Sequence, residues 1–155
     1  MIEVINIMAY YECTGGSGSG TIEKFYYYGD KNIDIITQRG VTEGKDYLIF
    51  ADGVASYSAY IRFSIDITDI DVLLVGYNIG FGGGHSIYEA PALKLYTSDF
   101  GTQQLEKKFP AAAGTDKRID GFMDVSTYKG NVGIQLSAGR YTDGFNCYYI
   151  LGLKI

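Results

Sequence analysis

The sequence has 155 residues, a formal net charge of -5, one histidine, two cysteines and no tryptophan. A chain of this length forms one ordinary domain and buries enough surface to fold without a disulfide or a metal. The acidic balance argues against nucleic acid as a partner, and no apolar run approaches the ~18 residues of a membrane-spanning helix. We therefore expect a single domain over residues 1–155, with no nucleic-acid or membrane partner.

Apolar and polar residues alternate with a period of two along most of the chain, with Gly, Asn, Asp and Ser between the alternating stretches. In the clearest stretch, every second residue from Tyr57 to Ile65 faces one side, as in a strand that covers a core. The pattern predicts strands at residues 3–11, 22–28, 32–37, 46–50, 57–65, 72–79, 92–97, 105–109, 118–125, 131–137 and 147–155. About ten short strands indicate an all-β fold, an antiparallel β-sandwich or barrel.

Helical signals are confined to two short stretches, near residues 98–103 and 126–128. Residues 14–21 are rich in Gly and Ser. This composition is typical of a flexible linker, and a long hairpin loop explains it equally well. The second Gly-rich segment, residues 80–84, lacks the Gly-Lys-Ser/Thr ending of a phosphate-binding loop, so we interpret it as a wide loop between strands.

Residues suited to catalysis are scarce. His85 is the only histidine and lies in a Gly-rich stretch. It is either a loop residue that contacts a ligand or a solvated turn residue. The acids show no spacing that singles out the opposed carboxylate pair of a glycoside hydrolase. We therefore expect no enzymatic activity and name no catalytic residue.

Three acids within six residues, Asp66, Asp69 and Asp71, resemble a small calcium site. The alternative is a solvated connection between strands, with Ile67 and Ile70 turned inward. Because the loop pattern of an EF-hand is missing, we assign no metal ligand and no cofactor, and keep calcium as an open alternative.

The two cysteines, Cys13 and Cys147, are far apart and form no Cys-x-x-Cys motif, which excludes a zinc knuckle or a thioredoxin motif. A disulfide between them and two separate thiols are both compatible with a sandwich. The first residues carry an acid and no base, so we expect no secretory signal.

Tyrosine is the strongest compositional signal, with 15 residues. In the runs at 26–28 and 148–149 some rings must point outward, since neighbouring side chains in a strand alternate. Outward tyrosines suit both sugar stacking and protein contacts, while strand propensity alone also favours tyrosine. As a candidate ligand-binding surface we name Tyr60, Arg62, Tyr77, Asn78, His85 and Tyr88.

The C-terminal half carries a recognisable pattern. Asp-Val-Ser-x-Tyr-x-Gly, from Asp124 to Gly130, separates two strands and is followed by a turn and a closing strand at 147–155. This resembles the jelly-roll modules of tail, baseplate, fibre and head-decoration proteins of phages, and the related carbohydrate-binding-module-like sandwiches. The resemblance covers roughly residues 55–155. Residues 1–50 would then add strands or form an arm.

The resemblance implies a jelly-roll β-sandwich and a non-catalytic bacteriophage virion structural protein, a decoration or tail-associated component. Its partners would be other virion proteins or copies of itself in a homo-oligomer, and its location the virion. The alternative is a carbohydrate-binding module that attaches a phage or an enzyme to cell-surface glycan. One sandwich hosts many tasks, so the fold alone does not choose between them.

Overall fold

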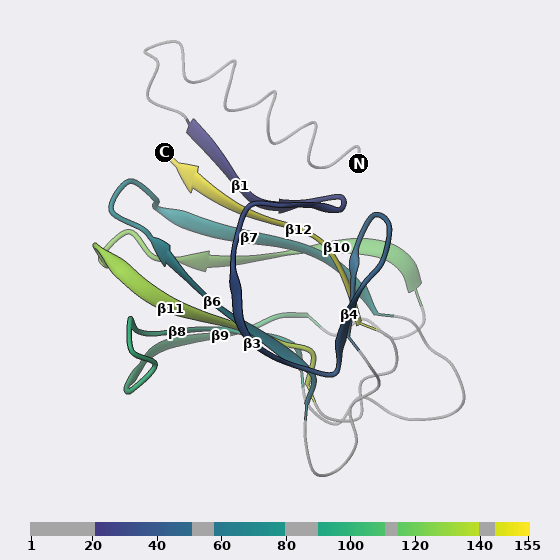
Figure 1. Ribbon diagram of the computed structural model, residues 1–155. Helices are drawn as coiled ribbons and strands as arrows, with labels where there is room; N and C mark the ends of the chain where they lie inside the picture. Colours follow the sequence, from purple (N-terminus) through teal and green to yellow (C-terminus); the bar gives the residue numbers. More distant parts are fainter. Residues whose placement is uncertain (1–20, 51–57, 80–89, 111–114, 140–144) are drawn as a thin grey trace.

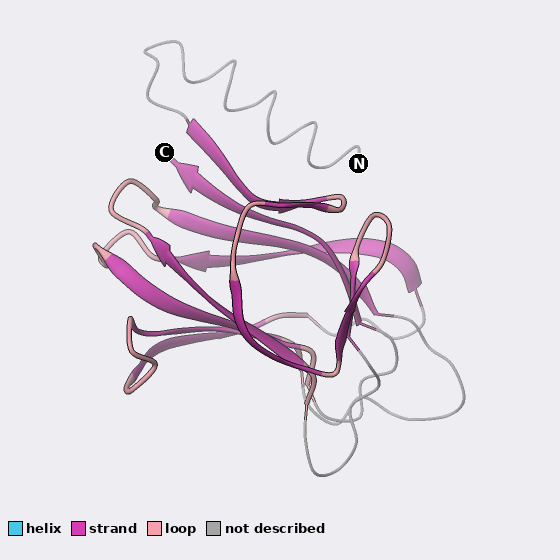
Figure 2. Cartoon of the chain, viewed as in Figure 1, coloured by secondary structure: helices cyan, strands magenta, loops and turns pink. Residues whose placement is uncertain are grey.

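The computed structural model describes residues 21–50, 58–79, 90–110, 115–139 and 145–155. Within these ranges the chain forms twelve strands in two antiparallel sheets and no helix (Figure 2). The prediction of an all-β antiparallel sandwich is therefore confirmed. Over the same residues, no helix is long and apolar enough to cross a bilayer.

The first sheet is built around the C-terminal strand. Its strands follow one another in the order β10 (Thr115–Asp124), β7 (Val72–Ile79), β12 (Phe145–Lys154), β1 (Thr21–Tyr27) and β2 (Asp30–Lys31). Two further strands extend it: β5 (Leu48–Phe50) pairs with β12, and β4 (Val41–Glu43) pairs with β5. Strands from residues 21–50 therefore complete this sheet.

The second sheet contains β3 (Ile35–Arg39), β6 (Tyr60–Asp66), β11 (Asn131–Ser137), β8 (Ala92–Thr97) and β9 (Gln103–Lys108), in that spatial order. The two sheets form two facing layers, with β1, β12, β7 and β10 above and β3, β6, β11, β8 and β9 below (Figure 1). Each sheet therefore has one face toward the core and one outer face.

The core fills the space between the layers because the strands alternate as the sequence predicts. In β6, Ile61 and Phe63 are fully buried, while Tyr60 and Arg62 face outward. The neighbouring β11 buries Ile134 against them in the same way. Alternation of this kind fixes the register, since a slip of one residue would turn the apolar side chains into water.

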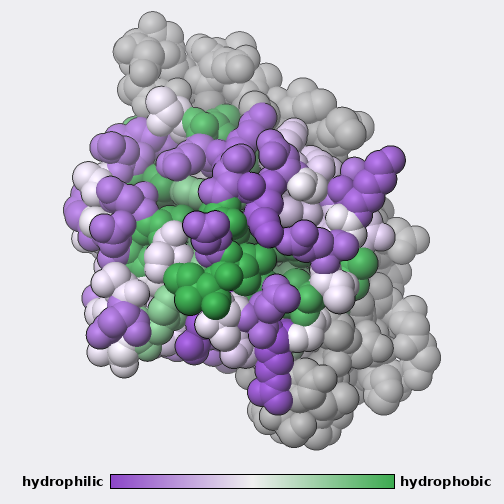
Figure 3. All heavy atoms as spheres, viewed as in Figure 1, coloured by the Kyte–Doolittle hydropathy of each residue, from purple (hydrophilic) through white to green (hydrophobic). Residues whose placement is uncertain are grey.

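A groove opens where the two sheets separate at one side of the sandwich. It has a volume of about 440 Å³ and an apolar floor that includes Phe25, Ile33 and Ile65. Ile36 lines it and remains 58% exposed. Hydrophobic side chains gather between the layers on the face seen in Figure 3. The connection from β2 to β3 therefore closes this side only in part.

Sequence and structure differ in the short elements. The strand predicted at 32–37 is observed slightly later, as β3, while β2 and β4 were not predicted. The two helical signals are turns. In one of them Asp124 Oδ1 accepts hydrogen bonds from Ser126 N at 2.9 Å and from Ser126 Oγ at 2.6 Å. Such side-chain bonds to the local backbone favour turns over helices.

The acidic stretch after β6 is also a turn. Asp66 Oδ1 accepts bonds from Thr68 N at 2.9 Å and Thr68 Oγ1 at 2.6 Å, and these lower the pKa of Asp66. Ile67 and Ile70 are buried, as the alternative predicted. Asp71 accepts a bond from the Ile155 backbone. In the described residues no group of three or more side chains is arranged to hold a metal, and calcium stays a prediction.

Cys147 is a fully buried free thiol whose pKa is raised by that burial. The other cysteine, Cys13, lies outside the described residues, as do the strand predicted at 3–11 and most of the Gly/Ser-rich segment.

Candidate functional site

The outer side of the first sheet carries an apolar cluster that is separate from the core. Leu74, Tyr149, Leu151 and Leu153 are buried in it. Five partly exposed side chains pack against them: Ile22, Tyr27, Tyr28, Val72 and Tyr148. A sheet face that merely met water would carry polar residues here, so this face is built as an aromatic surface.

A β-bulge brings two consecutive tyrosines to this face. The pairing of β12 with β7 shifts between Cys147 and Tyr149, which leaves Tyr148 as the extra residue. Cys147 points into the core, and Tyr149 lies across Gly76 on the outer side. A Cβ atom on Gly76 would lie 2.1 Å from the Tyr149 ring, so only glycine leaves room for it.

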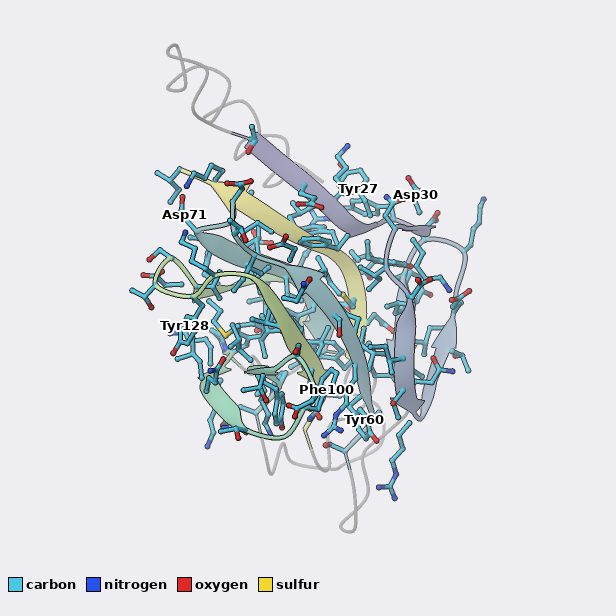
Figure 4. The ribbon with its side chains drawn as sticks, turned by 60° about the vertical axis from the view of Figure 1, so that its left-hand side comes forward. Tyr27, Asp30, Tyr60, Asp71, Phe100 and Tyr128 are labelled. Atoms are coloured by element: carbon cyan, nitrogen blue, oxygen red, sulfur yellow. The ribbon has the colours of Figure 1, made fainter. Side chains whose placement is uncertain are left out.

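Five tyrosines gather on this side of the sheet, and we call them the tyrosine face: Tyr27, Tyr28, Tyr47, Tyr148 and Tyr149. The ring centres of Tyr27 and Tyr28 are 4.8 Å apart with an interplanar angle of 85°. Tyr148 lies 6.0 Å from Tyr28 and 5.3 Å from Tyr47. Figure 4 labels Tyr27 on β1, at the outer side of this sheet. The rings therefore form a connected surface over β1, β12 and the start of β5.

A charged pair from β10 supports the rings. The guanidinium carbon of Arg118 lies 5.9 Å from the Tyr28 ring centre and 5.7 Å from that of Tyr149. Arg118 Nη1 donates a hydrogen bond to the Tyr28 hydroxyl, and the Tyr149 hydroxyl donates one to Asp120. Because the Tyr28 oxygen accepts from Arg118, its own proton is left to donate outward. Arg118 Nε is buried and has no hydrogen-bond partner in the described part of the chain.

Two asparagines form a second polar support. Asn146 Nδ2 donates to Asn78 Oδ1 at 3.0 Å, and Asn78 Nδ2 donates to the Tyr148 hydroxyl at 3.0 Å. This chain fixes the position of the Tyr148 ring. It also places amide groups at the edge of the tyrosine face, where they can exchange hydrogen bonds with a polar ligand.

Two hydroxyl groups of this face, those of Tyr28 and Tyr149, stay protonated over the physiological range. Burial, with smaller contributions from neighbouring Tyr27 and Asp120, raises the pKa of Tyr28 to about 12. Burial also raises the pKa of Tyr149, and its bond to Asp120 acts in the same direction. The face therefore offers neutral hydrogen-bond donors beside aromatic rings.

Of the six residues that the sequence suggests as one ligand surface, the four that the structure describes do not lie together. Tyr60 and Arg62 share the outer side of the second sheet, and Asn78 belongs to the first. Tyr77 is fully buried in the core, where its ring stacks on Phe145 and its hydroxyl donates to the Pro110 carbonyl at 2.5 Å. An outward Tyr77 is therefore wrong. His85 and Tyr88 lie outside the described residues.

The sequence interpretation missed the polar part of the tyrosine face. It identified the tyrosine runs but gave no role to Arg118, Asp120 or Asn146. One signal was present: Arg118 and Asp120 are two apart in a predicted strand, which puts both on one face. Their partners on β1 and β12 follow only from the sheet order.

The sequence matches no family model and no curated protein. Solved structures do match. A family 29 carbohydrate-binding module from Piromyces equi has a TM-score of 0.60 at 9% identity, over 88% of this chain and 92% of that chain. A mutant family 29 module gives 0.58 at 10% identity, over 86% and 92%. Another mutant, complexed with cellulohexaose, gives 0.56 at 12% identity, over 87% and 92%.

At these identities the likeness concerns the fold. It supports the carbohydrate-binding-module part of the resemblance that the sequence suggests, and it does not support the phage-virion part.

Proposed function

We propose that this protein is a non-catalytic glycan-binding module whose tyrosine face holds a neutral polysaccharide chain. The observation that carries the proposal is the juxtaposition of partly exposed tyrosine rings with an ordered polar network of Arg118, Asp120, Asn78 and Asn146. A pyranose ring presents apolar C–H faces and an equatorial rim of hydroxyl groups. Aromatic rings take the faces, and fixed polar groups take the rim.

The structural neighbours support this reading. Two of them are family 29 carbohydrate-binding-module mutants complexed with cellulohexaose and with mannohexaose. These two hexasaccharides are therefore the probes to try first. The expectation of a virion component gains no support from the neighbours, so glycan binding, the alternative drawn from the sequence, becomes the main proposal.

Binding rather than catalysis fits the chemistry of the face. The raised pKa values of Tyr28 and Tyr149 keep these two side chains neutral, and the Asp120 carboxylate is engaged by the Tyr149 hydroxyl. Glycoside hydrolysis needs a second carboxyl group across the bond, and the tyrosine face does not supply one from its described residues.

Calorimetric titration with cellulohexaose and mannohexaose tests the proposal. We expect the wild type to bind at least one of them, and Tyr28→Ala and Tyr148→Ala to weaken that binding about tenfold each, the equivalent of about 1.4 kcal/mol. Tyr60→Ala is the matched control, because it removes a partly exposed tyrosine from the opposite sheet. If the wild type binds neither hexasaccharide, or if all three variants bind alike, the proposal is wrong.

A further inference from the structure

The outer side of the second sheet carries another ordered cluster, which the proposed function does not use. The guanidinium carbon of Arg62 lies 5.6 Å from the Tyr60 ring centre, 5.4 Å from that of Tyr96 and 5.1 Å from that of Phe100. Arg62 Nε donates to Gln135 Oε1 at 2.7 Å. We call these five residues the arginine clamp. In Figure 4, Tyr60 and Phe100 lie near each other and far from Tyr27.

A tight turn between β8 and β9 holds Phe100 in the clamp. Phe100 has a φ of 60°, a left-handed conformation that is costly for a bulky residue. Asp99 Oδ1 fixes the turn by accepting from Thr97 Oγ1 at 2.6 Å and from Gly101 N at 2.9 Å. The ring then lies over Gly133, where a Cβ atom would come within 2.8 Å of it. Backbone strain of this kind is concentrated at functional sites.

Within the described ranges, no carboxylate pairs with the positive charge of the clamp. No carboxylate of the described residues lies within 4.0 Å of Arg62, and the guanidinium bonds to them only through Nε. Neither Nη group has a hydrogen-bond partner in the part of the chain that the structure describes, so both can meet a ligand. A half-buried cation enclosed by rings loses part of its hydration, so an incoming anion would interact with it more strongly than at an open surface.

More cations lie next to the clamp. Gln135 Nε2 donates to Ser137 Oγ at 2.8 Å, and Ser137 lines a small hollow together with Lys94, Lys108 and Glu106. Lys94 Nζ is 3.8 Å from Glu106. Clamp and hollow together hold three cations and one acid, on a protein whose net charge is -5. The charge of this surface is opposite to that of the whole chain.

We propose that the arginine clamp and the adjacent hollow form a second binding site, for an acidic sugar. The planar carboxylate of a uronic acid would accept two parallel hydrogen bonds from the Nη groups of Arg62, a geometry that guanidinium matches better than ammonium. The sugar ring would pack on Tyr60 and Tyr96, and the next carboxylate along the chain would reach Lys108. The site lies on the opposite sheet from the tyrosine face, so each proposal stands or fails separately.

Titration with tetragalacturonate and with its fully methyl-esterified form tests this site. We expect the wild type to bind the acid, with an affinity that falls as salt is added. Arg62→Gln and methyl esterification should each weaken binding at least about tenfold. Arg62→Lys keeps the charge but loses the two-pronged bond, and should fall between wild type and Arg62→Gln. Tyr28→Ala should bind tetragalacturonate as the wild type does.

Thermal unfolding shows whether each variant is folded. Should Arg62→Gln fail to fold, Lys108→Gln replaces it, since Lys108 is exposed and outside the clamp; it should weaken binding about two- to fivefold. The proposal is overturned if the acid does not bind, if the ester binds equally well, or if folded Arg62 and Lys108 variants bind as the wild type. It is overturned too if Tyr28→Ala, and not Arg62→Gln, removes binding, because the acid would then occupy the tyrosine face.

Discussion

The two outer faces of the sandwich hold an aromatic ring in place in different ways. Each seats an aromatic ring over a glycine: Tyr149 over Gly76 in the first sheet, and Phe100 over Gly133 in the second. Tyr149 is fully buried and anchored by Asp120, within a strand. Phe100 is half-buried and held at a hairpin tip. The first face is therefore a platform rigid by packing, and the second is a clamp that depends on one turn.

Gly76→Ala should break the first face and gives the largest effect. The new Cβ would meet the Tyr149 ring at 2.1 Å, and the ring has no exposed side toward which to move. We expect a loss of about 2–3 kcal/mol in the free energy of unfolding, together with the loss of hexasaccharide binding. Urea unfolding and calorimetry measure the two effects. A variant as stable as the wild type would show that the Tyr149 ring moves freely, and this would contradict the claim that packing makes the first face rigid.

Removing the bond between Tyr149 and Asp120 should have the second largest effect on stability. Tyr149→Phe and Asp120→Asn should each lower the free energy of unfolding by about 1–2 kcal/mol, because the hydroxyl donates to a charged acceptor in a half-buried place. The double variant should cost clearly less than the sum, with a coupling of about 1 kcal/mol. Additive costs, measured by urea unfolding of all four proteins, would mean that the two groups do not interact.

Several residues show which parts of the fold could be predicted from the sequence and which could not. The strand at 57–65 could be predicted because one side is consistently apolar, and of that side the structure buries Ala59, Ile61, Phe63 and Ile65. The orientation of Tyr77 could not be predicted, because β7 is apolar on both faces and its sequence does not show which face points to the core. The tyrosine pair of β12 is misjudged by alternation alone, since the bulge after Cys147 shifts the register. The residues around Cys147 include no glycine that would mark this bulge in the sequence.

The residues of the two candidate sites show the same difference between what one strand reveals and what the sheet order adds. Tyr60 and Arg62 were correctly placed together by their spacing of two in one strand. Arg118 met Tyr28, and Arg62 met Phe100, only because strands distant in sequence are neighbours in the sheets. Spacing within a strand predicts which side chains share a face. It does not predict which strand lies next to it.

Gly133→Ala makes the same substitution on the second face, where it should change the free energy of unfolding much less. The new Cβ would meet the Phe100 ring at 2.8 Å, but the half-exposed ring can swing toward water. The strand also gains about 0.5–1 kcal/mol when alanine replaces glycine, so the free energy of unfolding should change by less than about 1 kcal/mol. Tetragalacturonate binding should weaken while hexasaccharide binding is unchanged. A loss of stability equal to that of Gly76→Ala would make the two faces equivalent.

Alkaline pH gives an effect that is absent at neutral pH, and it again concerns the first face. The pKa of Tyr28 is raised from 10.0 to about 12 in the folded protein. Between these values the unfolded chain loses the proton that the folded chain keeps, so unfolding becomes more favourable as pH rises. The contribution of Tyr28 to stability should be level below about pH 10 and fall from about pH 10 to about pH 12. The buried Cys147 thiol, whose pKa is raised from 9.0, adds a fall that begins near pH 9 in the wild type and in the variant alike. Tyr28→Phe removes one such group, so its stability should fall less steeply over the same interval. Tyr26, whose pKa is also raised to about 12 by burial, supplies a slope that remains in the variant. Urea unfolding of both proteins across this interval measures the difference, and identical slopes would show that Tyr28 is as well hydrated in the folded state as in the unfolded one.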